Sequence, residues 1–158
     1  MKSLIYIVLF IFLIFYRLQD DLFAQIKSVD CIACLDTTNQ LETLIMTNKT
    51  QLHTHKGKKL ICHFLLCFDS KCSNAVELGE YSNEIIFKLL EDYPKLTLEI
   101  MSKNKKQIPW KNICDAIAEP INNVNNINEI IENIDAISGY SNVKMDVLNA
   151  LNTAKDSL

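Results

Sequence analysis

The cysteines are the residues of this 158-residue chain whose spacing most clearly allows specific chemistry. Cys31 and Cys34 form a C-x2-C pair. In a reducing compartment this spacing suits a metal or a redox disulfide, whereas in an oxidising compartment it suits structural disulfides. The compartment therefore decides how the pattern is interpreted. The other cysteines are Cys62, Cys67, Cys72 and Cys114.

Histidines near these cysteines allow an alternative to disulfides, namely a zinc site. Tetrahedral zinc takes His and Cys ligands, and a set could be drawn from His53, His55, Cys62, His63 and Cys67. We favour disulfides, because a secreted chain uses the same cysteines for crosslinks. The sequence has no G-x-S-x-G motif, recognisable nucleophile set or paired-carboxylate pattern. We therefore expect no metal, no cofactor and no enzymatic activity.

The N-terminus predicts the oxidising compartment. Residues 4–16 are an unbroken run of 13 apolar residues. Because spanning a bilayer takes about 20, this run predicts a signal peptide over residues 1–24, cut after Ala24. The alternative is an uncleaved anchor flanked by Arg17, Asp20 and Asp21. The expected location is outside the cell, or in acidic vesicles or lysosomes reached through the secretory pathway. There, Asn48 of Asn-Lys-Thr is a glycan acceptor.

Apolar residues recur at helical spacing and the chain has only three Gly and three Pro, which together predict an all-α fold. Residues 121–158 are expected to form a separate helical tail, in which a hairpin presents an apolar stripe that serves either as core or as a partner site. Helices are expected over residues 30–46, 58–67, 73–92 and 110–118, whereas residues 95–106 fit a strand or a helix equally well.

Cys62 follows Cys34 by 28 residues and Cys72 follows ten later, and Pro109, Ile113 and Cys114 lie in one short segment near residue 110. Together with the C-x2-C pair, these residues resemble the saposin-like (saposin B-type) family over residues 29–120, and Pro109, Ile113 and Cys114 match its closing motif. The segment around Cys114 and the helical tail are also similar, more weakly, to the MANF (mesencephalic astrocyte-derived neurotrophic factor) family. The chain departs from the saposin pattern in lacking the last family cysteine near Pro120 and in having Cys67 as an extra one.

The resemblance implies a disulfide-linked saposin-like helical bundle with a C-terminal helical hairpin tail. It implies the pairs Cys34–Cys114 and Cys62–Cys72, and leaves Cys31–Cys67 as the third. It also implies a non-catalytic protein that binds or perturbs lipid membranes by opening its helices as two leaves, and it leaves room for a homo-oligomer. The alternative is a MANF-like secretory-pathway factor that acts through protein contacts.

Core burial and lipid contact are alternative roles for the large apolar side chains. The candidates for lipid contact are Phe64, Ile85, Ile86, Leu89, Leu90 and Trp110. The net charge of −3 gives no basic field for nucleic acid. Two basic clusters, residues 56–59 and 103–106, are either solvated surface or sites for a phosphate or a lipid headgroup. His53, His55 and His63 are either exposed loop residues or pH sensors that bring the formal charge from −3 to 0 on acidification.

Overall fold

The structure is a computed structural model that describes residues 31–69, 76–121 and 126–157. Throughout these ranges the secondary structure is helical, with no strand, which confirms the all-α prediction. The predicted signal peptide and Cys72 lie outside the described residues. The helices are α2 (Cys31–Thr47), the 3-10 helix η1 (Lys49–His53), α3 (His55–Leu66), α4 (Val76–Asp92), α5 (Pro94–Asn104), α6 (Trp110–Ala118), α7 (Ile127–Asp135) and α8 (Ser141–Ser157).

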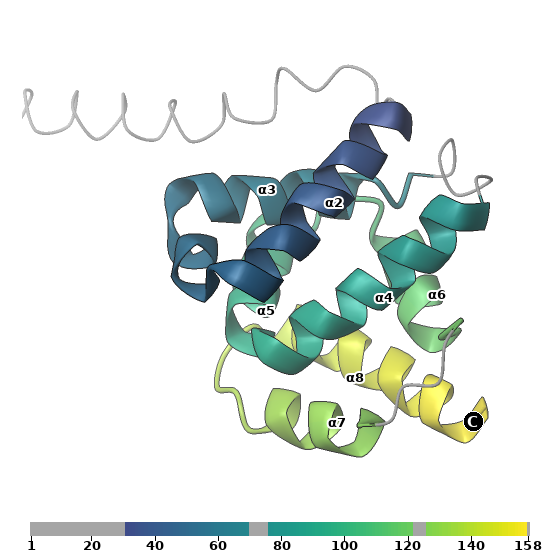
Figure 1. Cartoon of the computed structure of the whole chain (residues 1–158). Coiled ribbons are helices and arrows are strands. Elements are labelled where there is room, and N and C mark those ends of the chain that lie inside the picture. Colours follow the sequence, from purple (N-terminus) through teal and green to yellow (C-terminus); the bar gives the residue numbers. More distant parts are fainter. Residues whose placement is uncertain (1–30, 70–75, 122–125, 158) are drawn as a thin grey trace, which may run out of the picture.

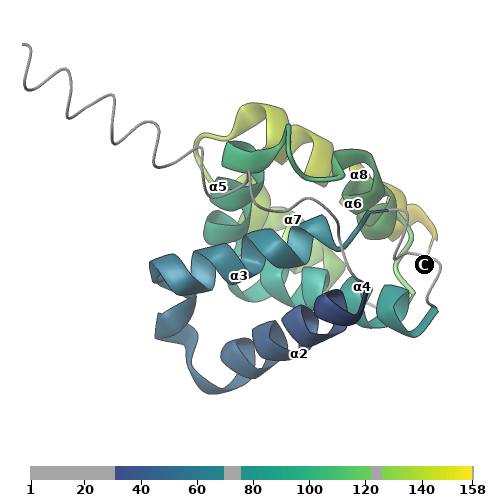
Figure 2. The same cartoon turned by 90° about the horizontal axis from the view of Figure 1, so that it is seen from above.

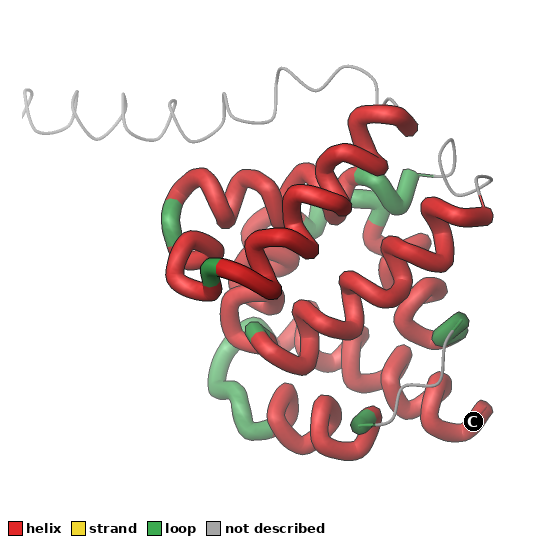
Figure 3. Tube along the Cα trace, in the orientation of Figure 1, coloured by secondary structure: helices red, strands yellow, loops and turns green. Residues whose placement is uncertain are grey.

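The helices stack in three layers (Figure 1). We call α2, η1 and α3 the α2–α3 layer; its two long helices run side by side (Figure 2). The central layer holds α4, α5 and α6, and the tail layer holds α7 and α8. In the first interface α2 packs on α4 and α3 packs on α5. In the second interface α7 packs on α4 and α5, and α8 packs on α5 and α6. Short loops join the helices within each layer (Figure 3).

Residues 95–106, which fitted strand or helix equally well, belong mostly to helix α5. Pro94 occupies its first turn, where the missing N–H costs nothing, and also ends α4 because it restricts Tyr93. The buried side chains of α5 cover several sides of the helix, since it lies between α3, α4, α7 and α8. Burial on several sides removes the usual helical stripe and leaves an alternating pattern that resembles a strand. These side chains are Leu96, Thr97, Leu98, Ile100 and Met101.

The tail shares the core of the rest of the molecule. Ile130 and Ile134 of α7, and Val147 and Leu151 of α8, have no exposed surface and belong to the same buried cluster as Leu41 of α2. The expected hairpin is present, and its apolar stripe is part of this common core. Its role as core was one of the two alternatives that the sequence left open.

A disulfide joins Cys34 at the start of α2 to Cys67 at the end of α3, with a Cα–Cα distance of 5.5 Å, ordinary for such a bond. The pairs expected from the family resemblance are therefore wrong. Cys62 is a buried free thiol and Cys114 a half-buried free thiol, so neither Cys34–Cys114 nor Cys62–Cys72 forms. Cys31–Cys67 is excluded because Cys67 bonds to Cys34, although Cys31 is itself disulfide-bonded. The physical reason is that these thiols lie in other parts of the fold than Cys34. Cys62 faces α5, and Cys114 lies on α6 near Asp146 of α8.

Peptide mapping under non-reducing conditions should recover Cys34 linked to Cys67, with Cys62 and Cys114 alkylated only after unfolding or slowly. Replacing Cys34 and Cys67 by Ser should lower the free energy of unfolding by about 2–4 kcal/mol, because the crosslink restricts the unfolded chain. Recovery of a Cys34–Cys114 peptide would contradict this arrangement.

Substitution in α8 should destabilise the whole described bundle. Leu151→Ala removes a fully buried side chain and should cost about 2–5 kcal/mol in one cooperative transition. Met145→Ala, at a position 63% exposed on the same helix, is the matched control and should change little. Urea unfolding followed by circular dichroism measures both. Two separate transitions, with only the weaker one affected by Leu151→Ala, would show that the tail folds alone.

Candidate functional site

Most side chains proposed for lipid contact lie inside the closed molecule. Phe64 on α3 and the α4 residues Ile85, Ile86, Leu89 and Leu90 have no exposed surface. They are therefore available to a lipid only if a layer moves. Phe64 also packs edge-to-face against Phe68, with ring centroids 5.4 Å apart.

The faces of α4 can be assigned from its polar contacts. Tyr81 donates a 2.5 Å hydrogen bond to Glu42 of α2, and Lys88 lies 3.5 Å from the same carboxylate. Ile85 lies between these two on the helix surface and Leu89 follows it by one turn, so both face the α2–α3 layer. By the same spacing Leu90 lies on the side of Asn83, toward α6. Separation of the α2–α3 layer would therefore expose Ile85 and Leu89 but leave Leu90 covered.

Polar contacts also join the α2–α3 layer to the central layer at the edge of their interface. Burial raises the pKa of Tyr81 to about 12, with the Glu42 hydrogen bond adding to the shift. Lys58 on α3 pairs with Glu99 on α5 at 3.2 Å. Hydrogen bonds from Lys103 and then Lys58 lower the pKa of Glu99. These contacts are partly exposed, and such pairs contribute little net stability, so apolar burial dominates the interface.

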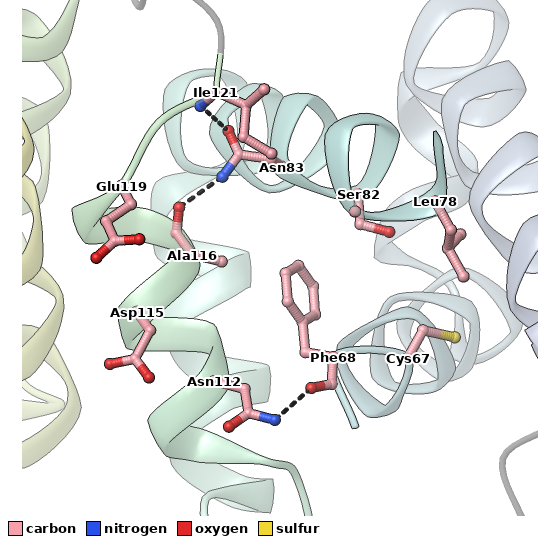
Figure 4. Close-up of a pocket in the computed structure, with 11 residues that line it drawn as sticks. Cys67, Phe68, Leu78, Ser82, Asn83, Asn112, Asp115, Ala116, Glu119 and Ile121 are labelled. Carbon is pink, nitrogen blue, oxygen red and sulfur yellow. Dashed lines mark hydrogen bonds between the residues drawn. The ribbon is translucent and has the colours of Figure 1, made fainter. Parts of the chain in front are cut away.

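A pocket of about 240 Å³ opens at one end of the same interface (Figure 4). Cys67 and Phe68 line it from the end of α3, Leu78 from α4, and Ala116 from α6. Most of the lining is apolar, and the acidic side chains of Asp115 on α6 and of Glu119, directly after α6, also border it. The pocket therefore lies mainly between α4 and α6, and the end of α3 contributes Cys67 and Phe68 to its rim.

Buried polar groups of α4 and α6 shape this pocket. Asn83, only 3% exposed, donates to the carbonyl of Ala116 at 2.5 Å and accepts from the N–H of Ile121 at 3.1 Å. Asn112 donates to the carbonyl of Phe68 at 2.7 Å (Figure 4). Ser82 is 4% exposed, and its hydroxyl has no hydrogen-bond partner in the described part of the chain. A buried hydroxyl without a partner is unfavourable, so a ligand atom that bonded it would be stabilised there.

Trp110 lies apart from the other proposed lipid contacts. It is half-buried at the start of α6, and its indole N–H donates to Asp146 of α8 at 2.9 Å. Lys105 lies 4.9 Å from the centre of its ring and 2.8 Å from the same carboxylate. The hydrogen bond from Lys105, and then that from Trp110, lower the pKa of Asp146. Trp110 thus holds α8 against α6.

The three histidines are spread over the α2–α3 layer. His53 contacts the ring of Tyr93, with centroids 6.4 Å apart, and His55 lines a small pocket beside Glu99. His63 lies in a groove between α2 and α3. Asn48, the proposed glycan acceptor, is half-buried between α2 and η1, where its side-chain oxygen accepts from the Thr50 hydroxyl at 2.9 Å.

Within the described ranges, no group of three or more metal-ligating side chains is placed to hold an ion. None of the helices described is both long and apolar enough to cross a bilayer. Comparisons of the chain with protein-family models, curated proteins and solved structures returned no match.

Sequence reasoning missed the polar residues that join helices distant in sequence. Glu42, Asn83 and Asn112 were each placed on a helix but given no role. Their partners lie 33 to 46 residues away in the chain, so no local pattern points to them. The available signal was that Asn83 shares a face of α4 with Ile86 and Leu90, where a buried polar side chain needs a hydrogen-bond partner.

His63 should make stability depend on pH. Burial, followed by the charge of Lys59, lowers its pKa below the usual 6.5. The unfolded chain therefore binds this proton more readily than the folded chain, and the free energy of unfolding falls as pH drops below about 6.5. Comparing His63→Gln with the parent from pH 7.5 to pH 5 by urea unfolding should show a smaller loss in the variant. His55→Gln, at an exposed position of the same helix, is the control; equal slopes for parent and His63→Gln would contradict the prediction.

Proposed function

We propose that this chain is a secreted or vesicular, saposin-like protein that binds or perturbs lipid membranes without catalysis. In this proposal, lipid contacts the apolar faces that the α2–α3 layer and the central layer bury against each other. The observation that carries the proposal is the extended apolar interface between these layers. Its apolar side chains include Phe64, Ile85 and Leu89, and a pocket opens at its end beside Phe68.

The Cys34–Cys67 bond supports movement of α2 and α3 as one unit. It joins the start of one helix to the end of the other, so the pair stays together when it separates from α4 and α5. Such a movement exposes apolar surface, which costs about 25 cal/mol for each Å² in water. A bilayer removes this cost, because the exposed faces then contact hydrocarbon instead of water.

Acid should favour the lipid-bound form. Protonation of His53, His55 and His63 brings the formal charge from −3 to 0 and reduces repulsion from anionic lipid. The lowered pKa of His63 adds to this, since its protonation destabilises the closed α2–α3 layer. We propose these three side chains as the pH-sensing groups.

Cys62 is a native reporter for the proposed opening. It is 3% exposed and lies between α3 and α5, and burial raises its pKa to about 12. In a Cys114→Ser background, N-ethylmaleimide should label Cys62 very slowly in buffer. Labelling should become severalfold faster with anionic phosphatidylserine–phosphatidylcholine vesicles, because opening exposes the thiol and restores its ordinary pKa.

Flotation of the same samples should show stronger binding of the protein to the vesicles at pH 5 than at pH 7.4, at matched ionic strength.

A Cys62→Ser, Cys114→Ser variant gives the labelling background, and unfolded protein gives the maximum. Vesicle binding without a rise in Cys62 labelling would refute lipid contact through this interface. No binding at either pH would refute lipid binding altogether. That result would favour the alternative, a MANF-like secretory-pathway factor that acts through protein contacts and uses the folded α7–α8 hairpin.

A further inference from the structure

A second concave site lies on the surface of the closed molecule, between α2 and α3. Its volume is about 370 Å³, within the roughly 300–1,000 Å³ of small-molecule sites. From α3 it is lined by Lys56, Lys59, Leu60 and His63, which share one helix face at spacings of three and four. Gln40, Thr43 and Leu44 line it from α2 with the same spacing, and Gln51 from η1. We call it the α2–α3 groove; every residue of its lining is described.

The charge of the α2–α3 groove has one sign. Lys56 and Lys59 are exposed, and neither forms an ion pair in the described ranges. No carboxylate lines the groove. By contrast Lys58, between them in sequence, points to the other side of α3 and pairs with Glu99. The groove therefore presents two unneutralised ammonium groups together with the side-chain amides of Gln40 and Gln51.

The position of Lys56 in the first turn of α3 is unfavourable for the helix alone. The first turn of a helix carries partial positive charge and favours acidic side chains, yet α3 begins with His55 and Lys56 and has no acidic residue there. Gly57 fixes this arrangement. A Cβ atom at this position would lie 2.6 Å from the Cα of Leu52 and closer still to the carbonyl oxygen of Gln51. Only glycine lets α3 approach η1 this closely, so the basic turn is held beside Gln51.

The floor of the groove is apolar. Leu44 and Leu60 are both half-buried and belong to its lining, and the carbon stems of the lysines extend this surface. A free inorganic anion would contact the ammonium groups but leave the floor exposed to water. A ligand that satisfies both features has an acidic group at one end and a hydrocarbon chain at the other.

We propose that the α2–α3 groove binds a single-chain anionic amphiphile, with its carboxylate or phosphate between Lys56 and Lys59 and its chain on Leu44 and Leu60. The site is present in the closed molecule, so it needs no separation of the layers. It is thus independent of the interface proposed above for membrane contact. Neutralising the basic first turn should also stabilise α3, and the complex should melt at a higher temperature than the free protein.

Decyl phosphate and decanoate, used below their micelle concentrations, are the probes. Calorimetry should detect binding of at least one of them, and which one binds better identifies the head group. Amide NMR shifts should move at Gln40, Thr43, Lys59 and Leu60. Lys56→Gln with Lys59→Gln should weaken affinity roughly ten-fold or more, the usual effect of losing charged hydrogen bonds. Lys95→Gln with Lys106→Gln changes the net charge equally at two exposed lysines outside the groove, and should leave affinity unchanged.

Inorganic phosphate tests the acidic group of the ligand alone, and decyl maltoside tests the hydrocarbon chain without a charge. Both should bind at least severalfold more weakly than the better probe. Phosphate binding as tightly as decyl phosphate would overturn the proposal, as would equal losses in the two double variants or binding of neither probe. Cys62 should stay protected in the complex, so failure of this site and failure of membrane binding are separate results.

Discussion

The burial of α4 between two layers is the constraint on which the rest of the structure depends. Residues on most sides of this helix are buried, including Ile85 toward the α2–α3 layer and Leu90 toward α6. A helix that is apolar on so many sides must be covered on each of them. One cover is the α2–α3 layer and the other is the tail layer, so α7 and α8 share one core with the rest of the described helices.

The two covers differ in how they are held. In the tail layer, Asp146 of α8 accepts hydrogen bonds from Lys105 and Trp110 and so joins this layer to the central layer. The α2–α3 layer is crosslinked within itself by Cys34–Cys67, and its polar contacts to the central layer lie at partly exposed edges, as at Glu42 and Glu99. Movement of the α2–α3 layer therefore breaks its polar contacts to the central layer but leaves the crosslink between α2 and α3 intact. The pocket beside Phe68 lies where the end of α3 meets α4 and α6.

Much of the fold could be predicted from the sequence, because local signals define the helices. The stripe of α2 and the Pro residues beside α4 and α6 place those helices to within a few residues. The lipid-contact candidates were correctly recognised as apolar helix faces, yet their burial against two layers depends on contacts distant in sequence. The disulfide pairing failed for the same reason. The spacing of Cys34 and Cys114 matched a family pattern, but pairing depends on which side of α3 or α6 a thiol occupies. Gly57 shows the limit most clearly: its role rests on the approach of η1, which no spacing in the Lys-Gly-Lys-Lys cluster reveals.

The central claim is that the α2–α3 layer moves as one unit away from the other two layers on a membrane. Spin labels attached through unnatural amino acids at positions 46 and 145, both exposed, would report the distance from α2 to α8 without disturbing the cysteines. A second pair at positions 46 and 55 would report the distance within the layer. On anionic vesicles we expect the first distance to lengthen while the second stays constant. An unchanged first distance on membrane-bound protein, or a change in both, would contradict the account.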